Sequence, residues 1–336
     1  MTPLDSSPSF DALLELASGY QRTRALLTLI ELDVPARLAD GPQDGAALAR
    51  SLSLHPLAAD RFLRACVTLG LLTCEGERYA NTPVAARFLV RGAPDYLGDY
   101  LDRHEGTEYL RWADLTDRLR AWRPARADGR EPPDDDQGVD AMEAQHTLAR
   151  LVGQALGRAY NFSQHRVLLD LGGGTGATSL SLCERYPDLR SLVFDRGPIV
   201  DAAARHARDA GLDGRVATLA GDFKRDPLPE GFDVALLANL LSVSSEATNR
   251  ALLARIFEAL PPGGAVILSG WILDEGRTSP TLPVLFCLKD IVWDAPDVER
   301  TVAQYTRWLV DAGFEDVRHE RYCPPTSMVV GRKPAR

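Results

Sequence analysis

The sequence lacks a run of about eighteen apolar residues, the length that a membrane-spanning helix requires. It also lacks the basic start and apolar core of a secretory signal, because Asp5, Asp11 and Glu15 interrupt the first eighteen residues. Cysteine is scarce: the five cysteines are odd in number and include no Cys-x-x-Cys pair that would indicate a zinc or redox centre. We therefore expect a cytoplasmic protein with reduced thiols, no membrane contact and no metal site.

Positive charge is also in short supply, since 38 Lys and Arg residues face 47 Asp and Glu residues and leave a formal charge of −9. Nucleic-acid affinity depends mostly on Lys and Arg, so this balance argues against a nucleic-acid partner and favours a small-molecule substrate. The 336 residues exceed the roughly 250–300 at which a single core stops growing, which predicts two domains.

The first part, residues 1–123, has the pattern of a mainly α-helical winged-helix domain. Apolar residues at helical spacing predict a long helix over 10–32 and a short one at 36–38. Helices at 46–52 and 56–69 and a ribbon over 72–79 then follow in the order of a winged helix. The candidate recognition helix, 57–64, carries only Arg61 and Arg64 as basic residues, so DNA binding is not favoured. The apolar face of 10–32 needs a partner, and we expect a homodimer.

Residues 124–139, rich in Pro, Gly and Asp, read as a linker to a second domain over 140–336. After a helix near 141–160, short β-rich runs alternate with helices, and these runs cover residues 167–171, 191–194, 216–219, 234–237 and 265–268. Such alternation is typical of an α/β domain with a parallel sheet and right-handed crossovers.

The first of these strands leads into a glycine turn, with Gly172, Gly174 and Gly176 between the strand and a helix that begins near Ala177. Glycine permits the backbone conformation and the close approach that a ligand lying over such a turn needs. The same spacing satisfies the loose dinucleotide fingerprint, so NAD is an alternative ligand. Asp170 favours S-adenosylmethionine (SAM), because its carboxylate can accept from an ammonium group but would repel a pyrophosphate.

Further polar residues follow the later strands. Asp195 can bind both hydroxyls of a ribose, as in NAD and SAM sites alike. Asp222 can accept from an adenine amino group, while Phe223 covers the base. Asn239, at the end of the fourth strand, is a further candidate cofactor contact. The second acidic anchor favours SAM over NAD.

With these motifs the chain resembles the SAM-dependent O-methyltransferases of plant phenolic and bacterial antibiotic methylation. The resemblance is most specific over residues 169–176, 221–223 and 261–264. It implies a class I SAM-methyltransferase Rossmann domain, a winged-helix dimerisation domain that is swapped within a homodimer, and SAM as cofactor. The SAM contacts that it implies are Gly172, Gly174, Asp195, Asp222 and Phe223.

The chain departs from this family at the chemistry site. The family's Leu-His-Asp-Trp, with its general-base histidine, is replaced by Leu-Ser-Val-Ser at residues 241–244, and a serine such as Ser242 has no pKa suited to that role. Glu299 still matches the family's Glu-Arg-Thr, although the histidine that it would orient is gone. The remaining candidates for catalytic residues are His146 and His104, whereas His165 and His206 read as surface residues.

Met142 and His146 lie one helical turn apart and should share a face. The candidate residues for the substrate pocket are Tyr100, Tyr109, Trp112, Met142, Ser242, Phe286 and Trp293. We expect methyl transfer without a histidine base, to a thioether sulfur, an amine nitrogen or an enolisable carbon. The alternatives are O-methylation of a phenolic or polyketide metabolite with a base such as His146, and a SAM-binding member with a non-methylating activity. From other classes, a NAD oxidoreductase and a winged-helix regulator remain as rivals.

Overall fold

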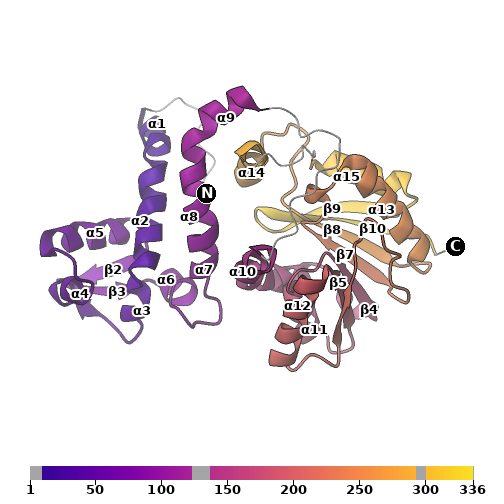
Figure 1. The fold of residues 1–336 in the computed structure, drawn as a ribbon, viewed down its shortest axis with the longest axis horizontal. Helices are drawn as coiled ribbons and strands as arrows, with labels where there is room; N and C mark the ends of the chain where they lie inside the picture. The colour runs from indigo at the N-terminus through magenta and orange to yellow at the C-terminus, as the bar shows by residue number, and fades with distance from the viewer. Residues whose placement is uncertain (1–9, 123–136, 293–299, 336) are drawn as a thin grey trace. The chain divides into compact units, whose positions relative to one another are not determined.

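The computed structural model describes residues 10–122, 137–292 and 300–335, and the chain forms two compact units, Met1–Leu110 and Arg111–Arg336 (Figure 1). This division falls before the predicted linker at 124–139, most of which lies outside the described residues. Helix α9 (Leu115–Ala121) belongs to the second unit, where it contacts α14 (Thr281–Val292).

Unit 1 contains the predicted winged helix. Helices α4 (Gly45–Ser51) and α5 (Pro56–Thr68) precede the hairpin of β2 (Leu72–Glu75) and β3 (Arg78–Asn81), and a short strand, β1 (Gln43–Asp44), pairs with β3. The carboxylate of Asp44 and the hydroxyl of Thr82 accept backbone N–H bonds at the starts of α4 and α6. The remaining elements of the unit are α3 (Val34–Arg37), α6 (Pro83–Phe88), α7 (Gly98–Tyr100), the π-helical turn η1 (Leu101–Glu105) and α8 (Gly106–Arg111), the last reaching into unit 2.

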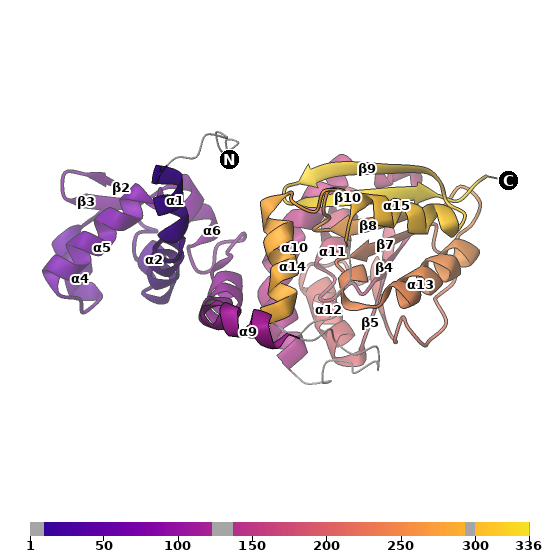
Figure 2. The same ribbon diagram turned by 90° about the horizontal axis from the view of Figure 1, so that it is seen from above.

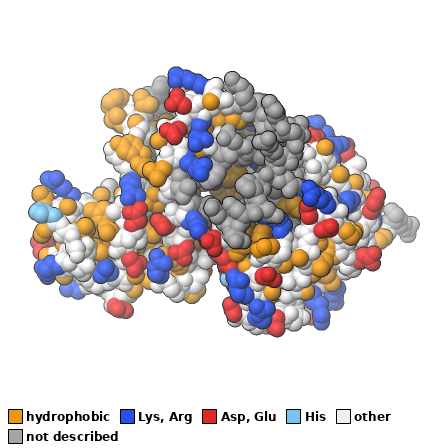
Figure 3. Space-filling view, viewed as in Figure 1, with side chains coloured by type: hydrophobic (Ala, Val, Ile, Leu, Met, Phe, Trp, Pro, Cys, Tyr) orange, Lys and Arg blue, Asp and Glu red, His pale blue; other side chains and the backbone are white. Residues whose placement is uncertain are grey.

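The first helix differs from its prediction. The single helix expected over 10–32 is two helices, α1 (Phe10–Ala17) and α2 (Gly19–Glu31), which are separated at Ser18. Helix α2 buries Leu27, Leu29 and Ile30, whereas α1 buries none of its residues. On α1 the side chains of Phe10, Leu13 and Leu16 are 74%, 63% and 80% exposed, and Figure 3 shows hydrophobic side chains gathered over this helix. This apolar surface needs an occupant.

Unit 2 is built on one seven-stranded sheet with the order β6-β5-β4-β7-β8-β10-β9. Figure 2 shows the edge strand β9 next to β10. Five strands match the predicted runs and are parallel, namely β4 (Val167–Leu171), β5 (Arg190–Asp195), β6 (Val216–Ala220), β7 (Val234–Ala238) and β8 (Ala265–Gly270). An antiparallel hairpin, β9 (Glu315–Cys323) and β10 (Thr326–Arg332), completes the sheet and was not predicted.

Helices cover both faces of this sheet (Figure 1). On one face lie α10 (Gln137–Ala159), α11 (Ala177–Arg185) and α12 (Gly197–Asp209), and on the other lie α13 (Glu246–Ala259) and α15 (Val302–Asp311). Short 3₁₀ turns stand at η2 (Trp112–Asp114), η3 (Phe162–Gln164) and η4 (Leu241–Val243). The predicted α/β architecture with a mainly parallel sheet is confirmed.

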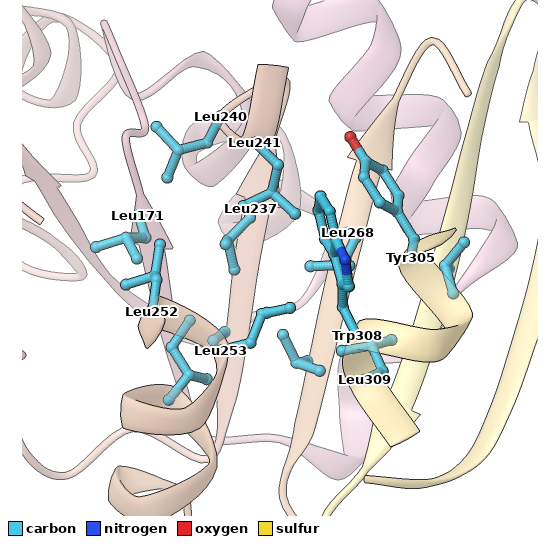
Figure 4. Packing of buried hydrophobic residues seen from close by; sticks show 14 of the residues in the cluster. Leu171, Leu237, Leu240, Leu241, Leu252, Leu253, Leu268, Tyr305, Trp308 and Leu309 are labelled. Atoms are coloured by element: carbon cyan, nitrogen blue, oxygen red, sulfur yellow. The ribbon is translucent and has the colours of Figure 1, made fainter. Parts of the chain in front are cut away.

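The strands alternate between two apolar cores because successive side chains point to opposite faces. Leu169 and Leu171 join Trp308 and Leu309 in the cluster beneath α13 and α15, which Figure 4 shows from close by. Leu168 packs into the other cluster, beneath α10–α12. With both faces buried, polar side chains of the parallel strands find room mainly at the strand ends.

No helix in the described parts of the chain is both long enough and apolar enough to cross a membrane. All five cysteines are free thiols, as the sequence predicts, and burial raises the pKa of Cys66 to about 12 and that of Cys183 to about 11.

Lys333, directly after β10, caps the carboxyl end of α13. Its Nζ donates to the carbonyls of Phe257, Glu258 and Leu260 at 2.7, 3.3 and 2.6 Å. A cation is favourable at this end of a helix because the last carbonyls lack helical donors. The lysine therefore ties α13 to the end of β10.

We expect Lys333→Met to lower the free energy of unfolding by on the order of 1–3 kcal/mol, since the methionine keeps the stem but leaves these carbonyls without the donor. Thermal and urea unfolding would measure the change. The neighbouring Arg332→Met is the matched control, because that guanidinium reaches the carbonyl of Gly263 at 3.5 Å, a longer contact. Equal stability of the two variants would contradict the capping role.

Candidate functional site

The glycine turn lies at the carboxyl end of β4, which has β5 on one side and β7 on the other in the sheet. The strand order reverses direction at this point. Gly172 and Gly174 have φ values of +67° and +58°, a region that side chains with a Cβ rarely adopt. The N–H of Gly172 donates to the carbonyl of Phe194 at 2.8 Å, and a Cβ on Gly172 would stand 2.5 Å from Leu240. The turn therefore fits only glycine at this position, packed between the two neighbouring strand ends.

Asp195 holds the turn in place from the end of β5. One carboxylate oxygen, Oδ2, accepts from the N–H of Gly174 at 2.9 Å, and Oδ1 accepts from the N–H of Arg196 at 2.8 Å. The side chain is half-buried, so the carboxylate stays accessible beside the turn. Its predicted role toward ribose hydroxyls is compatible with this place, because each oxygen has a second lone pair.

Asp170 lies directly beneath the turn and is fully buried. The Ser179 hydroxyl on α11 donates to Oδ2 at 2.5 Å, and burial raises the pKa of the carboxyl to about 6, although that hydrogen bond opposes the rise. A Cβ on Gly173 would come within 2.7 Å of this carboxyl group. Among the described residues Oδ1 has no hydrogen-bond partner. Burial of a polar oxygen without a partner is costly, and a donor brought by a ligand would satisfy it.

The ends of the next strands carry the other predicted cofactor residues. Asp222 follows β6, accepts from the N–H of Lys224 at 2.9 Å and keeps 32% of its side chain exposed. Phe223 beside it packs against the apolar cluster under α13. Asn239 follows β7 with a φ of +56° and donates its N–H to the carbonyl of Ser269 at 2.8 Å. Such a conformation is uncommon outside glycine and recurs at functional sites.

His146 reaches the glycine turn from α10. Its Nδ1 is 2.8 Å from the Thr175 hydroxyl, and its ring stacks on that of His206, with the centroids 3.8 Å apart. Burial, with the nearby His206 and Arg150, lowers the pKa of His146 to about 4. Met142 shares this helix face as predicted, because a Cβ on Gly174 would stand 3.6 Å from its sulfur.

Two further histidines, His165 and His206, were predicted to be surface residues; the prediction is wrong for His165, and His206 is half-buried. His206 stacks on His146, and its Nε2 lies 2.7 Å from the Glu143 carboxylate. His165 is 4% exposed, and its Nε2 lies 2.8 Å from the Tyr160 hydroxyl. These contacts join residues of different elements, and local spacing does not encode them.

The turn after β7 carries Ser242. Its hydroxyl donates to the carbonyl of Asn239 at 2.8 Å. The fully buried Asn249 of α13 donates from Nδ2 to the carbonyls of Leu241 and Ser244 at 2.8 and 3.3 Å. Asn249 was missed in the sequence. The available signal was an amide on the apolar face of a helix, in register with Leu252, Leu253 and Ile256.

On α14, Phe286 packs edge-on against Trp271, with the ring centroids 5.2 Å apart. Trp271 follows β8 and was not among the predicted pocket residues. Trp293 and Glu299 lie outside the described residues. Trp112 is half-buried on η2, whereas Tyr100, His104 and Tyr109 belong to unit 1, on α7, η1 and α8, and their functional roles stay predictions.

The arrangement fits SAM in its donor and acceptor chemistry. SAM carries an ammonium group, ribose hydroxyls and an adenine amino group, all hydrogen-bond donors. Three strand ends present the carboxylates of Asp170, Asp195 and Asp222, around a turn in which side chains have no space. A dinucleotide pyrophosphate would meet the buried carboxylate of Asp170 beneath the turn, an unfavourable pairing of like charges.

Comparison with known proteins agrees with this chemistry. The O-methyltransferase domain model matches residues 112–315, and the O-methyltransferase dimerisation domain model matches residues 14–91. The 3-hydroxy-5-methyl-1-naphthoate 3-O-methyltransferase of Streptomyces sahachiroi is 34% identical over 323 residues, covering 93% of this chain and 92% of that protein. The N,N-dimethyltransferase OxyT of Streptomyces rimosus is 33% identical, covering 95% of each chain.

A crystal structure of human N-acetylserotonin methyltransferase in complex with SAM superposes with a TM-score of 0.83. It is 28% identical and covers 98% of this chain and 99% of that chain. The similar proteins thus include methyltransferases of oxygen and of nitrogen, on the same two-domain fold. The chain belongs to the SAM-dependent O-methyltransferase family, and it is an enzyme that transfers a methyl group from SAM to a small molecule.

Proposed function

We propose that this methyltransferase acts on an acceptor whose attacking atom needs no proton removed by an enzyme base. A neutral amine nitrogen, a thioether sulfur and a readily enolised carbon meet this condition. The observation that carries the proposal is Ser242, whose hydroxyl donates to the carbonyl of Asn239 at the place where the family has its histidine base. A hydroxyl group near neutral pH is a poor proton acceptor.

His146 does not supply the missing base well. With its pKa lowered to about 4, the ring is neutral but only weakly basic, and its Nδ1 is engaged with the Thr175 hydroxyl. An effective general base has a pKa near the working pH. We assign His146 to the support of the glycine turn.

SAM supplies an activated methyl group, so that alignment of the two reactants and exclusion of water can provide much of the catalysis. Asp195, Asp222, Phe223, Asn239, Gly172 and Gly174 would hold the cofactor, and Asp170 would accept from its ammonium group. Met142, Phe286 and Trp271 offer apolar surface on α10, α14 and the segment after β8. An amine acceptor would use its own lone pair and leave with its proton as an ammonium product.

A second candidate function is O-methylation of a phenol, which the 34% identity to a naphthoate 3-O-methyltransferase favours. A phenol has a pKa of about 10 and would need a base, for which His146 is the candidate on this chain. The two candidates differ in what the protein must do, because only the phenol requires proton removal before or during methyl transfer.

We expect Asp195→Ala to weaken SAM binding by roughly five- to a hundredfold, because a partly buried hydrogen-bonding carboxylate is lost. Isothermal titration of SAM into the folded variant would measure the change. Asp201→Ala, an exposed carboxylate on α12, is the matched control and should bind like the wild type. An unchanged dissociation constant for Asp195→Ala would remove this residue from the site.

The acceptor class can be decided with one ring system, such as naphthalene, carrying a hydroxyl, an amino or a methylthio group. With labelled SAM and mass spectrometry of the products, we expect transfer to the amine or the thioether. Ser242→Ala and His146→Gln should then keep most of kcat/KM. The pH profile of kcat/KM should show no inflection from His146 between about pH 6 and pH 8, because the pKa of His146 is far lower.

General-base removal costs about 10²–10⁴-fold, well above assay scatter, so the variants discriminate. Transfer to the hydroxyl alone, with a loss of this size in His146→Gln at normal SAM affinity, would replace the base-free proposal by the phenol candidate. A loss of this size in Ser242→Ala would show that the serine is essential.

The proposed active form is a homodimer, supported by the dimerisation domain model over residues 14–91 and by the exposed apolar face of α1. Light scattering should report twice the chain mass, and Leu13→Asp with Leu16→Asp should lower it, because two carboxylates would be buried at an apolar interface. Leu57→Asp, on the exposed face of α5, is the control. A wild-type monomer at micromolar concentration would refute the dimer.

A further inference from the structure

Arg300 is a charged residue in the interior of unit 2, only 4% exposed. Its backbone carbonyl accepts from the N–H of Leu273 at 2.7 Å, and the next residue, Thr301, forms a β-bridge with Leu273 and caps α15. The backbone of Arg300 is therefore fixed between the segment that follows β8 and the start of α15. With the backbone fixed in this way, the side chain of Arg300 contacts other segments.

The guanidinium group extends from this anchor to two other segments. Nη2 donates to the carbonyl of Ser242 at 3.3 Å, in the turn after β7. Nη1 lies 3.5 Å from the sulfur of Cys287 on α14, and the group stands 5.8 Å from the ring centroid of Phe286. The planar side chain of Arg300 thus joins the Ser242 turn to helix α14.

Tyr305 of α15 belongs to the same electrostatic neighbourhood. Arg300 and Cys287 both act electrostatically on its phenol, whose pKa burial raises to about 12, so the phenol stays neutral. Figure 4 shows the Tyr305 hydroxyl at the end of the apolar cluster where Leu240 and Leu241 lie. The guanidinium itself lies between the Ser242 turn and α14.

Shape matters more than charge for such a contact. A guanidinium is a rigid fork that can donate in two directions at once, whereas a lysine ammonium is a single point on a flexible stem. Phe286, which also packs on Trp271, is held on one side by this fork. Loss of the fork would let α14 and the turn move independently of one another.

We infer that Arg300 is the positioning residue of the acceptor wall, joining the Ser242 turn to α14 through its two terminal nitrogens. It acts through its contacts with Ser242, Cys287 and Phe286. The statement that the Ser242 turn and α14 face the acceptor rests on the proposed function. The link that Arg300 makes between these two segments does not depend on it.

Hydrogen exchange followed by mass spectrometry on the full chain tests the link without an acceptor. In Arg300→Lys we expect the peptides of α14 and of residues 241–244 to exchange at least about tenfold faster. A lysine cannot keep both the contact with Cys287 and the hydrogen bond to the carbonyl of Ser242. Peptides of the glycine turn should keep their rates, and affinity for S-adenosylhomocysteine should stay within about threefold. Arg300→Met should release both segments, and Cys287→Ala should release α14 but not the turn.

Arg250→Lys is the matched control, since Arg250 pairs with Asp311 at 2.6 Å on the surface of α13 and should leave both segments unchanged. Unchanged exchange at α14 and the turn in Arg300→Met would overturn the inference. So would equal acceleration in β4, which would indicate a general loss of stability. With an acceptor from the matched series, Arg300→Lys should raise the acceptor KM by about tenfold or more and leave the KM for SAM unchanged. If none of the matched acceptors is methylated while the exchange results hold, the proposed function is wrong and the link made by Arg300 stands.

Discussion

Burial of the central sheet on both faces is the constraint on which the rest of unit 2 depends. Leu169 and Leu171 point into one core and Leu168 into the other, so the parallel strands are covered along their length. Polar chemistry is then confined to the carboxyl ends of β4–β8, where the strand order reverses direction. The glycine turn, Asp195 and Asn239 all lie at this edge, and the site follows from the architecture.

The same burial sets the cost of the site. Asp170 shares the parity of Leu168 and points into the α10–α12 face, where burial raises its pKa to about 6. An ionised carboxyl is held there by one hydroxyl, that of Ser179, and has one oxygen with no partner among the described residues. A folded state that keeps such a group gives up stability for binding chemistry. A ligand ammonium group would recover part of that cost.

The proposed acceptor side, around the Ser242 turn, is organised differently from the proposed cofactor side. The cofactor turn is fixed by backbone geometry and by a carboxylate that accepts from Gly174. The Ser242 turn contains no glycine, and side chains from two other elements bond to its carbonyls: Asn249 of α13 and Arg300 before α15. Relatives that methylate oxygen and nitrogen share this fold. If the proposed sites are correct, a cofactor site held by the backbone can stay constant while an acceptor site held by side chains varies.

The sequence by itself determined the winged helix, the five parallel strands and the glycine turn. The spacing of apolar residues sets which face of a helix or strand is buried, and glycine sets the local backbone conformation. It also placed Asp195 and Asp222 at strand ends. Only the tertiary structure decided that α1 and α2 separate at Ser18, that His165 is buried and His206 stacks on His146, and that β9 and β10 complete the sheet. Arg300 and Ser242 are 58 residues apart in the chain, and their contact exists only because β7, β8 and α15 pack together. Contacts across such separations depend on the packing of whole elements, which no local pattern records.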